Sequence, residues 1–139
     1  MGNLADETRW LDATAQAELV RSGQVTAAEL AEAAAERIER LDTATNAVNL
    51  RWFDRAIDQA GRGDLCDGPF RGVPFLLKDL WAYRAGYPVT NGNKALKEAG
   101  YVADSTTWLV DRFEAAGFTT LGRTASPAFG RVKPSRWNW

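Results

Sequence analysis

The feature that most constrains the fold is an unbroken apolar run from Val73 to Leu77, which follows Gly72 and ends at Lys78 and Asp79. A short apolar run between a glycine and charged residues is typical of a buried strand. The sequence therefore predicts a strand over residues 73–77. A fold for this chain has to hold that strand inside and place the amine of Lys78 at its end.

Other segments predict helices and strands on both sides of this run. A threonine and a glutamate three residues apart, Thr26 and Glu29, form a capping box, which marks a helix start. Helices are expected over 12–21, 26–41, 51–59 and from a cap at Asp104 or Ser105 to Ala116, and further strands over 46–50 and 119–121. Helices that alternate with strands in this order predict an α/β sheet built from crossover units.

Composition excludes several classes of function. Seventeen basic and 18 acidic residues give a net charge of −1, so no overall field favours nucleic acid or an anionic membrane. No stretch approaches the roughly 20 apolar residues that span a bilayer, and the first residues lack the pattern of a signal peptide. The single cysteine, Cys66, is interpreted as an incidental thiol and agrees with a reducing, cytoplasmic setting.

Histidine is absent from the chain, which excludes Ser-His-Asp and Cys-His catalysis and histidine-based metal sites within it. We expect neither a metal nor an organic cofactor. Lys78 is the remaining candidate catalytic residue. It ends an apolar run that is expected to be buried, and burial makes an amine lose its proton more easily, so that it can act as a base. A structural lysine paired with Asp79 is the competing interpretation.

Four ordered motifs resemble the amidase signature family. The segment from Gly68 to Leu80 is similar to the family's glycine-proline, glycine-valine-proline and lysine-aspartate segment, and residues 90–93 lie where the family carries a threonine-x-glycine-serine loop. Residues 103–117 resemble the following helix, and residues 121–130 resemble the next conserved segment. Within the family, the chain is most similar to enzymes that act on cyclic amides of aminohexanoate.

This resemblance implies an α/β fold in which a mixed sheet is sandwiched by helices, here incomplete, and a hydrolase of C–N amide bonds. The family uses a Ser-cisSer-Lys triad, of which only the lysine maps here, onto Lys78. Substrate-binding positions would be Thr90, Asn91, Gly92 and Asn93. Residues 1–130 would form the N-terminal part of the domain, and residues 131–139 a divergent tail.

The two serines of the family lie in a glycine-rich segment that this chain does not contain. Its serines are Ser22, Ser105, Ser126 and Ser135, and none has glycine-rich flanks on both sides. A helix cap before Pro127 is the expected role of Ser126. We therefore expect the chain alone to be inactive.

The chain also departs from the family pattern at single positions. Arg123 stands where the family has a lysine, and we expect it to be harmless on a surface-facing strand end. Asn93 stands in place of the loop serine and Ala125 in place of an asparagine. Both changes concern the substrate site.

Two other functions remain open. The chain could be a non-catalytic, truncated interaction module that pairs through an open sheet edge, or a glutaminase subunit that supplies ammonia to a partner enzyme. The expected partners are a small-molecule amide and either a second copy of the chain or the missing C-terminal portion, with no nucleic acid and no membrane.

Overall fold

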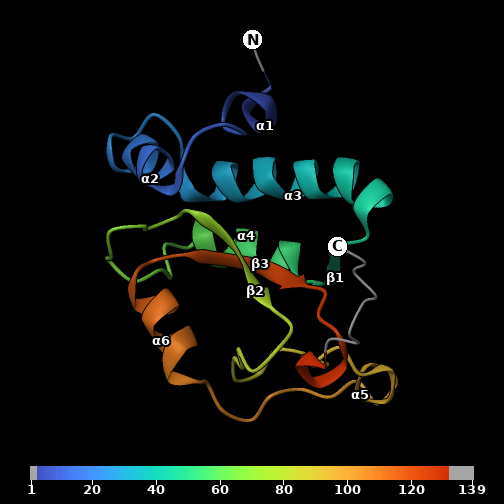
Figure 1. Ribbon diagram of the computed structural model, residues 1–139. Helices are drawn as coiled ribbons and strands as arrows, with labels where there is room; N and C mark the ends of the chain where they lie inside the picture. Colours follow the sequence, from blue (N-terminus) through green and yellow to red (C-terminus); the bar gives the residue numbers. More distant parts are fainter. Residues whose placement is uncertain (1–2, 132–139) are drawn as a thin grey trace, which may run out of the picture.

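The computed structural model describes residues 3–131. Its three strands, β1 (Val48–Arg51), β2 (Pro74–Lys78) and β3 (Thr119–Thr124), form one sheet in the order β1-β3-β2 (Figure 1). β2 runs parallel to β3, whereas β1 runs antiparallel to it. The α/β class and the mixed sheet are therefore confirmed. Residues 132–139, which make up nearly all of the expected tail, lie outside the described residues.

Helices occupy both sides of this sheet. Their bounds are Leu4–Glu7 (α1), Ala13–Arg21 (α2), Ala27–Thr45 (α3), Phe53–Gly61 (α4), Lys94–Glu98 (α5) and Trp108–Ala115 (α6), and a 3₁₀ helix spans Ala128–Gly130. The sequence patterns did not predict α1 or α5, each of which is too short to show a periodic apolar face, and the 3₁₀ helix was implied only by the cap expected at Ser126.

The capping box of α3 is confirmed. The backbone N–H of Glu29 donates to Thr26 Oγ1 at 3.1 Å, and the backbone N–H of Thr26 donates to Glu29 Oε2 at 2.7 Å. The helix continues to Thr45, four residues beyond the predicted end, and stops at Asn46, whose φ of 48° is left-handed. Asparagine is one of the few residues that adopt this conformation readily. The left-handed Asn46 therefore sets the end of the helix, and the end of the apolar stripe at Leu41 does not.

The start of α6 differs from the prediction. Its N-cap is Thr107, and neither Asp104 nor Ser105 caps it. Thr106 Oγ1 accepts a hydrogen bond from the Ala85 N–H at 3.0 Å, and the Thr107 N–H donates to the Tyr83 carbonyl at 3.1 Å. These bonds tie Thr106 and Thr107 to residues 83 and 85, so both residues are used in tertiary contacts and the helix begins only at Trp108.

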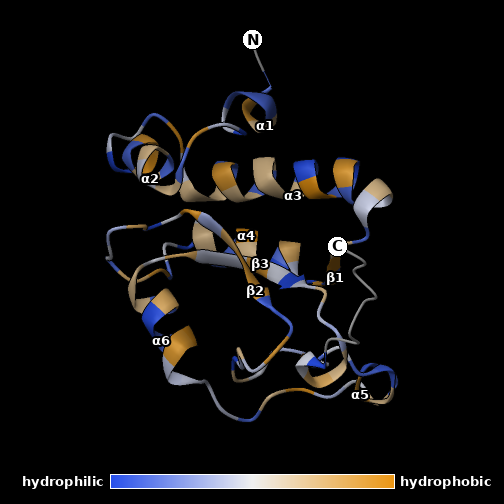
Figure 2. Cartoon of the chain, viewed as in Figure 1, coloured by the Kyte–Doolittle hydropathy of each residue, from blue (hydrophilic) through white to orange (hydrophobic). Residues whose placement is uncertain are grey.

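The pleat of β2 divides the interior into two apolar clusters. Leu76 packs against the α3–α4 side with the buried Ala34, Ala56 and Leu121, whereas Phe75 and Leu77 pack against α6. Adjacent residues of a strand point to opposite faces, so one short run serves both layers. Figure 2 shows β2 hydrophobic along most of its length and hydrophilic at its end, where Lys78 lies.

Candidate active site

Lys78 is the last residue of β2 and lies beside Thr124, its register partner in β3. The expected burial of its side chain is wrong: Lys78 is exposed, while the preceding Leu77 is buried. The reason is the pleat, which turns Leu77 towards α6 and sends the next side chain to the other face at the end of a strand. The amine is nevertheless anchored, because Lys78 Nζ donates a hydrogen bond to the carbonyl oxygen of Ala125.

The competing interpretation, a lysine paired with its neighbour, is not what the structure contains. Asp79 is fully buried and its carboxylate faces the loop that begins at Thr90. It accepts the backbone N–H of Thr90 at 2.8 Å, the Thr90 hydroxyl, the backbone N–H of Asn91 at 3.2 Å and the Asn49 amide at 2.7 Å. Burial acts to raise the pKa of Asp79, but the hydrogen bonds from Thr90 and Asn49 outweigh it, so the pKa lies below its ordinary value.

The four predicted substrate-binding residues form one short loop whose side chains are largely engaged within the protein. The Thr90 hydroxyl is bound to Asp79, and Asn91 accepts from the Trp81 N–H at 3.1 Å and donates to the Tyr83 hydroxyl at 2.9 Å. Asn93 caps α5 by accepting the Ala95 N–H at 2.8 Å. Gly92 has a φ of 69°, a backbone conformation that glycine adopts without strain and that other residues adopt only at a cost.

The loop at 90–93 lies directly against the segment that follows β3. The carbonyl of Asn91 accepts the Phe129 N–H at 2.7 Å, and a Cβ at Gly92 would lie 2.2 Å from the Ser126 carbonyl oxygen. Since Lys78 is bonded to Ala125 in the same segment, the structure brings Lys78, the loop and residues 125–129 to one place. The sequence motifs predicted these members separately, and the fold joins them.

Ser126 does not cap a helix as predicted. Its hydroxyl donates to the carbonyl of Pro127 at 3.1 Å, and the 3₁₀ helix that starts at Ala128 has no side-chain cap. Pro127 itself occupies the N-cap position of this helix, one residue after Ser126. The Ser126 hydroxyl therefore does not accept a hydrogen bond from a backbone N–H of the first turn.

Arg123 corrects another expectation, because it is fully buried and not at the surface. Its Nε donates to the Pro88 carbonyl at 2.7 Å, and its Nη1 donates to the carbonyls of Ala82 at 2.6 Å and Lys78 at 3.3 Å. Burial lowers the pKa of Arg123 to about 10, although the negative charge of Asp79 acts in the opposite direction. The guanidinium thus ties the end of β2 to the chain that leads into the 90–93 loop.

Other site types find no support within residues 3–131. No group of three or more His, Cys, Asp or Glu side chains in that range is placed to hold a metal ion. Cys66 is a free, exposed thiol. None of the helices described for these residues has the length and apolar character needed to cross a membrane.

Comparison with known proteins identifies the family to which this geometry belongs. A model of the amidase family matches residues 29–133. The chain belongs to the amidase signature family. Over 131 residues it is 43% identical to the 6-aminohexanoate-cyclic-dimer hydrolase of Paenarthrobacter ureafaciens, and over 129 residues it is 35% identical to an acylamidase of Rhodococcus erythropolis.

Solved structures agree with this assignment. The structure of a 6-aminohexanoate cyclic dimer hydrolase complexed with substrate superimposes with a TM-score of 0.80 at 43% identity over 92% of this chain. A bacterial aryl acylamidase of the amidase signature family gives a TM-score of 0.77 at 32% identity over 88% of this chain. Both matches confirm that the fold is that of amidase signature enzymes.

The matched region is a limited part of these enzymes. The chain spans about a quarter of the length of the curated relatives that it matches: 26% of each of the two relatives named above, and 27% of the substrate-bound hydrolase structure. The resemblance in sequence and fold therefore covers nearly all of this chain but only a minor share of each relative.

Proposed function

We propose that this chain supplies the lysine of a Ser-cisSer-Lys amide hydrolase, with Lys78 as the base, and that further amidase polypeptide supplies the two serines. The observation that carries the proposal is the position of Lys78 in a family member: it lies at the end of β2, held by Ala125, next to the loop at 90–93. The setting of such an enzyme is proposed to be the cytoplasm.

The anchoring of Lys78 suits the role of a base. The hydrogen bond to the Ala125 carbonyl uses one N–H of the amine and fixes its direction. Once the amine has given up its extra proton in the assembled enzyme, this bond leaves its lone pair free to accept a proton from a hydroxyl group. In the proposed reaction this proton comes from the nucleophilic serine through the bridging serine, and the serine oxygen attacks the amide carbonyl. The C–N bond then breaks as the proton is passed back to the departing amine nitrogen, and water hydrolyses the acyl-enzyme ester, which releases the acid and restores the serine hydroxyl.

The loop at 90–93 is proposed to form a wall of the substrate pocket. Asp79 accepts two backbone N–H groups of this loop, and the side chain of Asn91 binds the loop to the Trp81 N–H, which supports a role in fixing the shape of the pocket. The substrate class that we propose is a small amide, with cyclic amides of aminohexanoate first, because the named relatives include hydrolases of the 6-aminohexanoate cyclic dimer.

A chimera tests the proposal. This chain would replace the matched segment of the Paenarthrobacter ureafaciens hydrolase, and hydrolysis of the 6-aminohexanoate cyclic dimer, of simple aryl amides and of glutamine would be measured. We expect turnover of an amide by the chimera, a loss of at least a thousandfold in kcat for Lys78→Met, and little change for Lys94→Met, an exposed lysine in α5.

Three results would count against the proposal. An inactive but folded chimera would contradict it, and so would a Lys78→Met chimera that retains its rate. Hydrolysis of an amide by the purified 139-residue chain alone would show that the two serines are not needed from elsewhere. Activity confined to glutamine, with release of ammonia, would favour the glutaminase alternative.

A further inference from the structure

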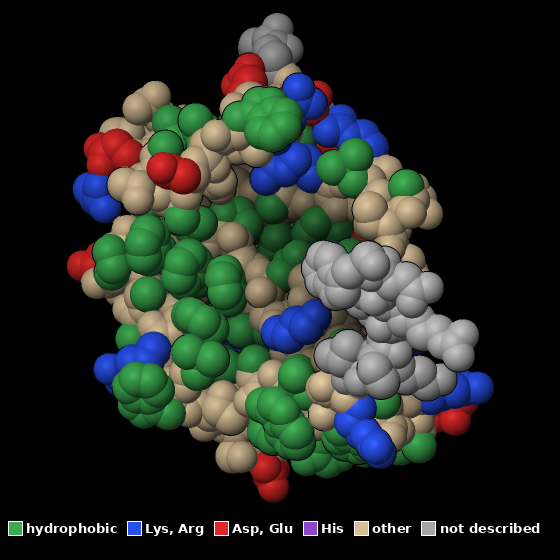
Figure 3. All heavy atoms as spheres, viewed as in Figure 1, with side chains coloured by type: hydrophobic (Ala, Val, Ile, Leu, Met, Phe, Trp, Pro, Cys, Tyr) green, Lys and Arg blue, Asp and Glu red, His purple; other side chains and the backbone are tan. Residues whose placement is uncertain are grey.

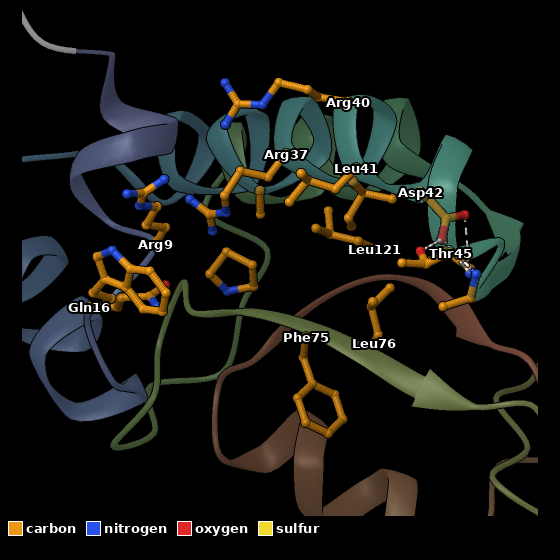
Figure 4. Close-up of a pocket in the computed structure, with 16 residues that line it drawn as sticks. Arg9, Gln16, Arg37, Arg40, Leu41, Asp42, Thr45, Phe75, Leu76 and Leu121 are labelled. Carbon is orange, nitrogen blue, oxygen red and sulfur yellow. Dashed lines mark hydrogen bonds between the residues drawn. The ribbon is translucent and has the colours of Figure 1, made fainter.

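A hollow of about 650 Å³ lies between α3 and β2, with hydrophobic atoms on its floor (Figure 3). The polar groups on its rim already have partners. Arg37 donates to the Ala5 carbonyl at 2.7 Å and to the Thr8 hydroxyl at 2.8 Å. Asp42 accepts the Thr45 hydroxyl at 2.8 Å (Figure 4). Small-molecule sites direct a few free polar groups at the ligand, so this hollow gives no reason to expect a polar ligand in it.

Backbone strain, in contrast, gathers close to Lys78. Within residues 3–131, the residues other than glycine that have a positive φ are Asn46, Trp81, Asn91 and Phe129. Asn46 ends α3, and asparagine tolerates the left-handed conformation, but a large aromatic residue rarely adopts it. Trp81, with a φ of 57°, and Phe129, with a φ of 49°, are therefore outliers that contacts in the fold have to hold in place.

Both outliers are held by the same residue, Asn91. Its side-chain oxygen accepts the Trp81 N–H at 3.1 Å, and its backbone carbonyl accepts the Phe129 N–H at 2.7 Å. Its side-chain amide donates to the Tyr83 hydroxyl at 2.9 Å, and the centre of the Tyr83 ring lies 6.3 Å from that of Trp81. Asn91 is itself left-handed and buried. Hydrogen bonds thus join the three left-handed residues of this region to one another.

The strain does not bring the two aromatic rings into the core. Trp81 is 57% exposed and Phe129 is 46% exposed. An aromatic side chain that stays largely in water gains little from the hydrophobic effect, and glycine would fit either backbone with less strain. Folding stability therefore does not explain why these positions carry large rings. Strained residues of this kind cluster at functional sites.

The two aromatic residues belong to segments that meet at Lys78. Trp81 follows Lys78 by three residues, which span at most about 11 Å of chain. Phe129 lies in the segment whose Ala125 carbonyl accepts the hydrogen bond from Lys78 Nζ. An apolar surface made by these rings would therefore lie beside the candidate base and not in a remote part of the fold.

We propose that the rings of Trp81 and Phe129 form an apolar subsite for the hydrocarbon part of the amide substrate, and that Asn91 is the positioning residue that holds both. This inference rests on the proposed function, because it concerns the substrate of the reaction at Lys78. A side chain that is already held in one conformation loses little freedom when it binds, which favours affinity. The subsite selects amides with a long apolar chain over short ones.

The experiment uses the chimera described above and two linear amides that differ in chain length, acetamide and hexanamide. Ammonia release gives kcat and KM for each amide. The test variants are Trp81→Gly and Phe129→Gly, because glycine removes the ring and suits the left-handed backbone. The matched controls are Trp108→Ala and Tyr101→Ala, at aromatic side chains 72% and 42% exposed that do not have a positive φ.

We expect the parent chimera to have a kcat/KM for hexanamide about tenfold or more above that for acetamide, because each methylene that a ring covers contributes up to about fourfold. Trp81→Gly and Phe129→Gly should each reduce this ratio at least fivefold, mainly through KM, because a ring that contacts unreactive carbon binds substrate and transition state alike. The controls should keep the ratio within twofold. Asn91→Gly should lower it as well, although Asn91 is buried.

Thermal unfolding of the same chimeras separates a binding role from a packing role. Trp81→Gly should melt at or above the temperature of the parent, because it relieves the left-handed conformation, and Trp81→Ala should melt below Trp81→Gly, because alanine keeps that strain. If a glycine variant does not fold, Trp81→Asn and Phe129→Asn replace it, since asparagine also adopts this conformation and carries no ring.

Four outcomes would overturn the inference: equal kcat/KM for the two amides in the parent, ring variants that keep the ratio, controls that lose it to the same extent, and ring variants that melt well below the parent. The last would show that the rings serve packing.

The two proposals can fail separately, because binding of both amides to the Lys78→Met chimera, followed by NMR titration, needs no turnover. An active, Lys78-dependent chimera whose ratio the ring variants leave unchanged removes only the subsite. An inactive chimera that binds hexanamide more tightly than acetamide, and loses this preference in the ring variants, removes only the catalytic function. A chimera that neither turns over nor binds either amide removes both.

Discussion

The carboxylate of Asp79 receives the backbone N–H of Thr90 at 2.8 Å, and this bond joins the residue after Lys78 to the first residue of the loop at 90–93. Two segments that are distant in sequence are thus fixed to each other at a buried position. The geometry of the candidate site depends on Asp79 at least as much as on the lysine itself, because within residues 3–131 Lys78 is held by its backbone in β2 and by one bond of its amine.

Replacement of this carboxylate is expected to destabilise the chain. Asp79→Asn removes the charge and leaves a buried N–H donor facing other donors, so we expect a loss of about 2 kcal/mol in the free energy of unfolding. Urea denaturation monitored by circular dichroism would measure the change. Asp67→Asn, at an exposed loop position, is the control and should change the stability by less than about 0.5 kcal/mol. Equal effects of the two substitutions would contradict the role of Asp79.

The lowered pKa of Asp79 also predicts how stability depends on pH. A carboxyl group whose pKa is lower in the folded than in the unfolded chain contributes stability above its ordinary pKa of 3.8, and this contribution disappears as the pH falls through the lower, folded value. Unfolding free energies measured between pH 6 and pH 3 should therefore decline with acid for the parent chain. The decline should be shallower for Asp79→Asn but not absent, because the pKa of Asp42 is lowered too.

The bonds of Arg123 predict a second stability effect. Arg123→Met leaves the carbonyls of Lys78, Ala82 and Pro88 without this donor, and we expect a loss of about 3 kcal/mol in the free energy of unfolding. Arg123→Lys keeps a cation that can reach only some of these carbonyls, so its loss should be smaller. Arg112→Met, at an exposed position of α6, should have little effect. An Arg123→Met chain as stable as the parent would contradict the buried clamp.

Two glycines allow backbone strain to be separated from steric contact. Gly92 and Gly100 both have positive φ angles, of 69° and 60°, but a Cβ at Gly92 would lie 2.2 Å from the Ser126 carbonyl oxygen, whereas nothing lies within 4 Å of one at Gly100. Both alanine substitutions carry the strain of about 1 kcal/mol expected for a left-handed alanine. Gly92→Ala should cost about 2 kcal/mol more in thermal or urea denaturation, because the backbone must also move apart.

Local sequence patterns were sufficient for the elements around Lys78. The apolar run at 73–77 predicted β2 to within one residue, and the capping box located the start of α3, because both signals lie within a few residues of the feature they describe. The position of Lys78 at the end of a strand followed from the same run.

The exposure of Lys78 and the burial of Arg123 could not be predicted in this way. Whether a strand residue is covered depends on which strand lies in the middle of the sheet, and this order is set by pairing between distant segments. β3 lies between β1 and β2, so the side chain of Arg123 is enclosed, whereas β2 ends where Lys78 reaches the surface. The contacts between the loop at 90–93 and residues 125–129 likewise involve segments more than 30 residues apart.

The central place of β3 also determines the order in which the sheet can form. β1 and β2 do not pair with each other, and both pair with a strand that the ribosome makes after them. While the chain is being synthesised, the helices α2, α3 and α4 can form from local contacts, but within the described part of the chain both earlier strands find their partner only in β3, which ends at Thr124. Until then, two strands with open edges are available for contacts with other nascent chains, and a chaperone that shields them would act in this interval.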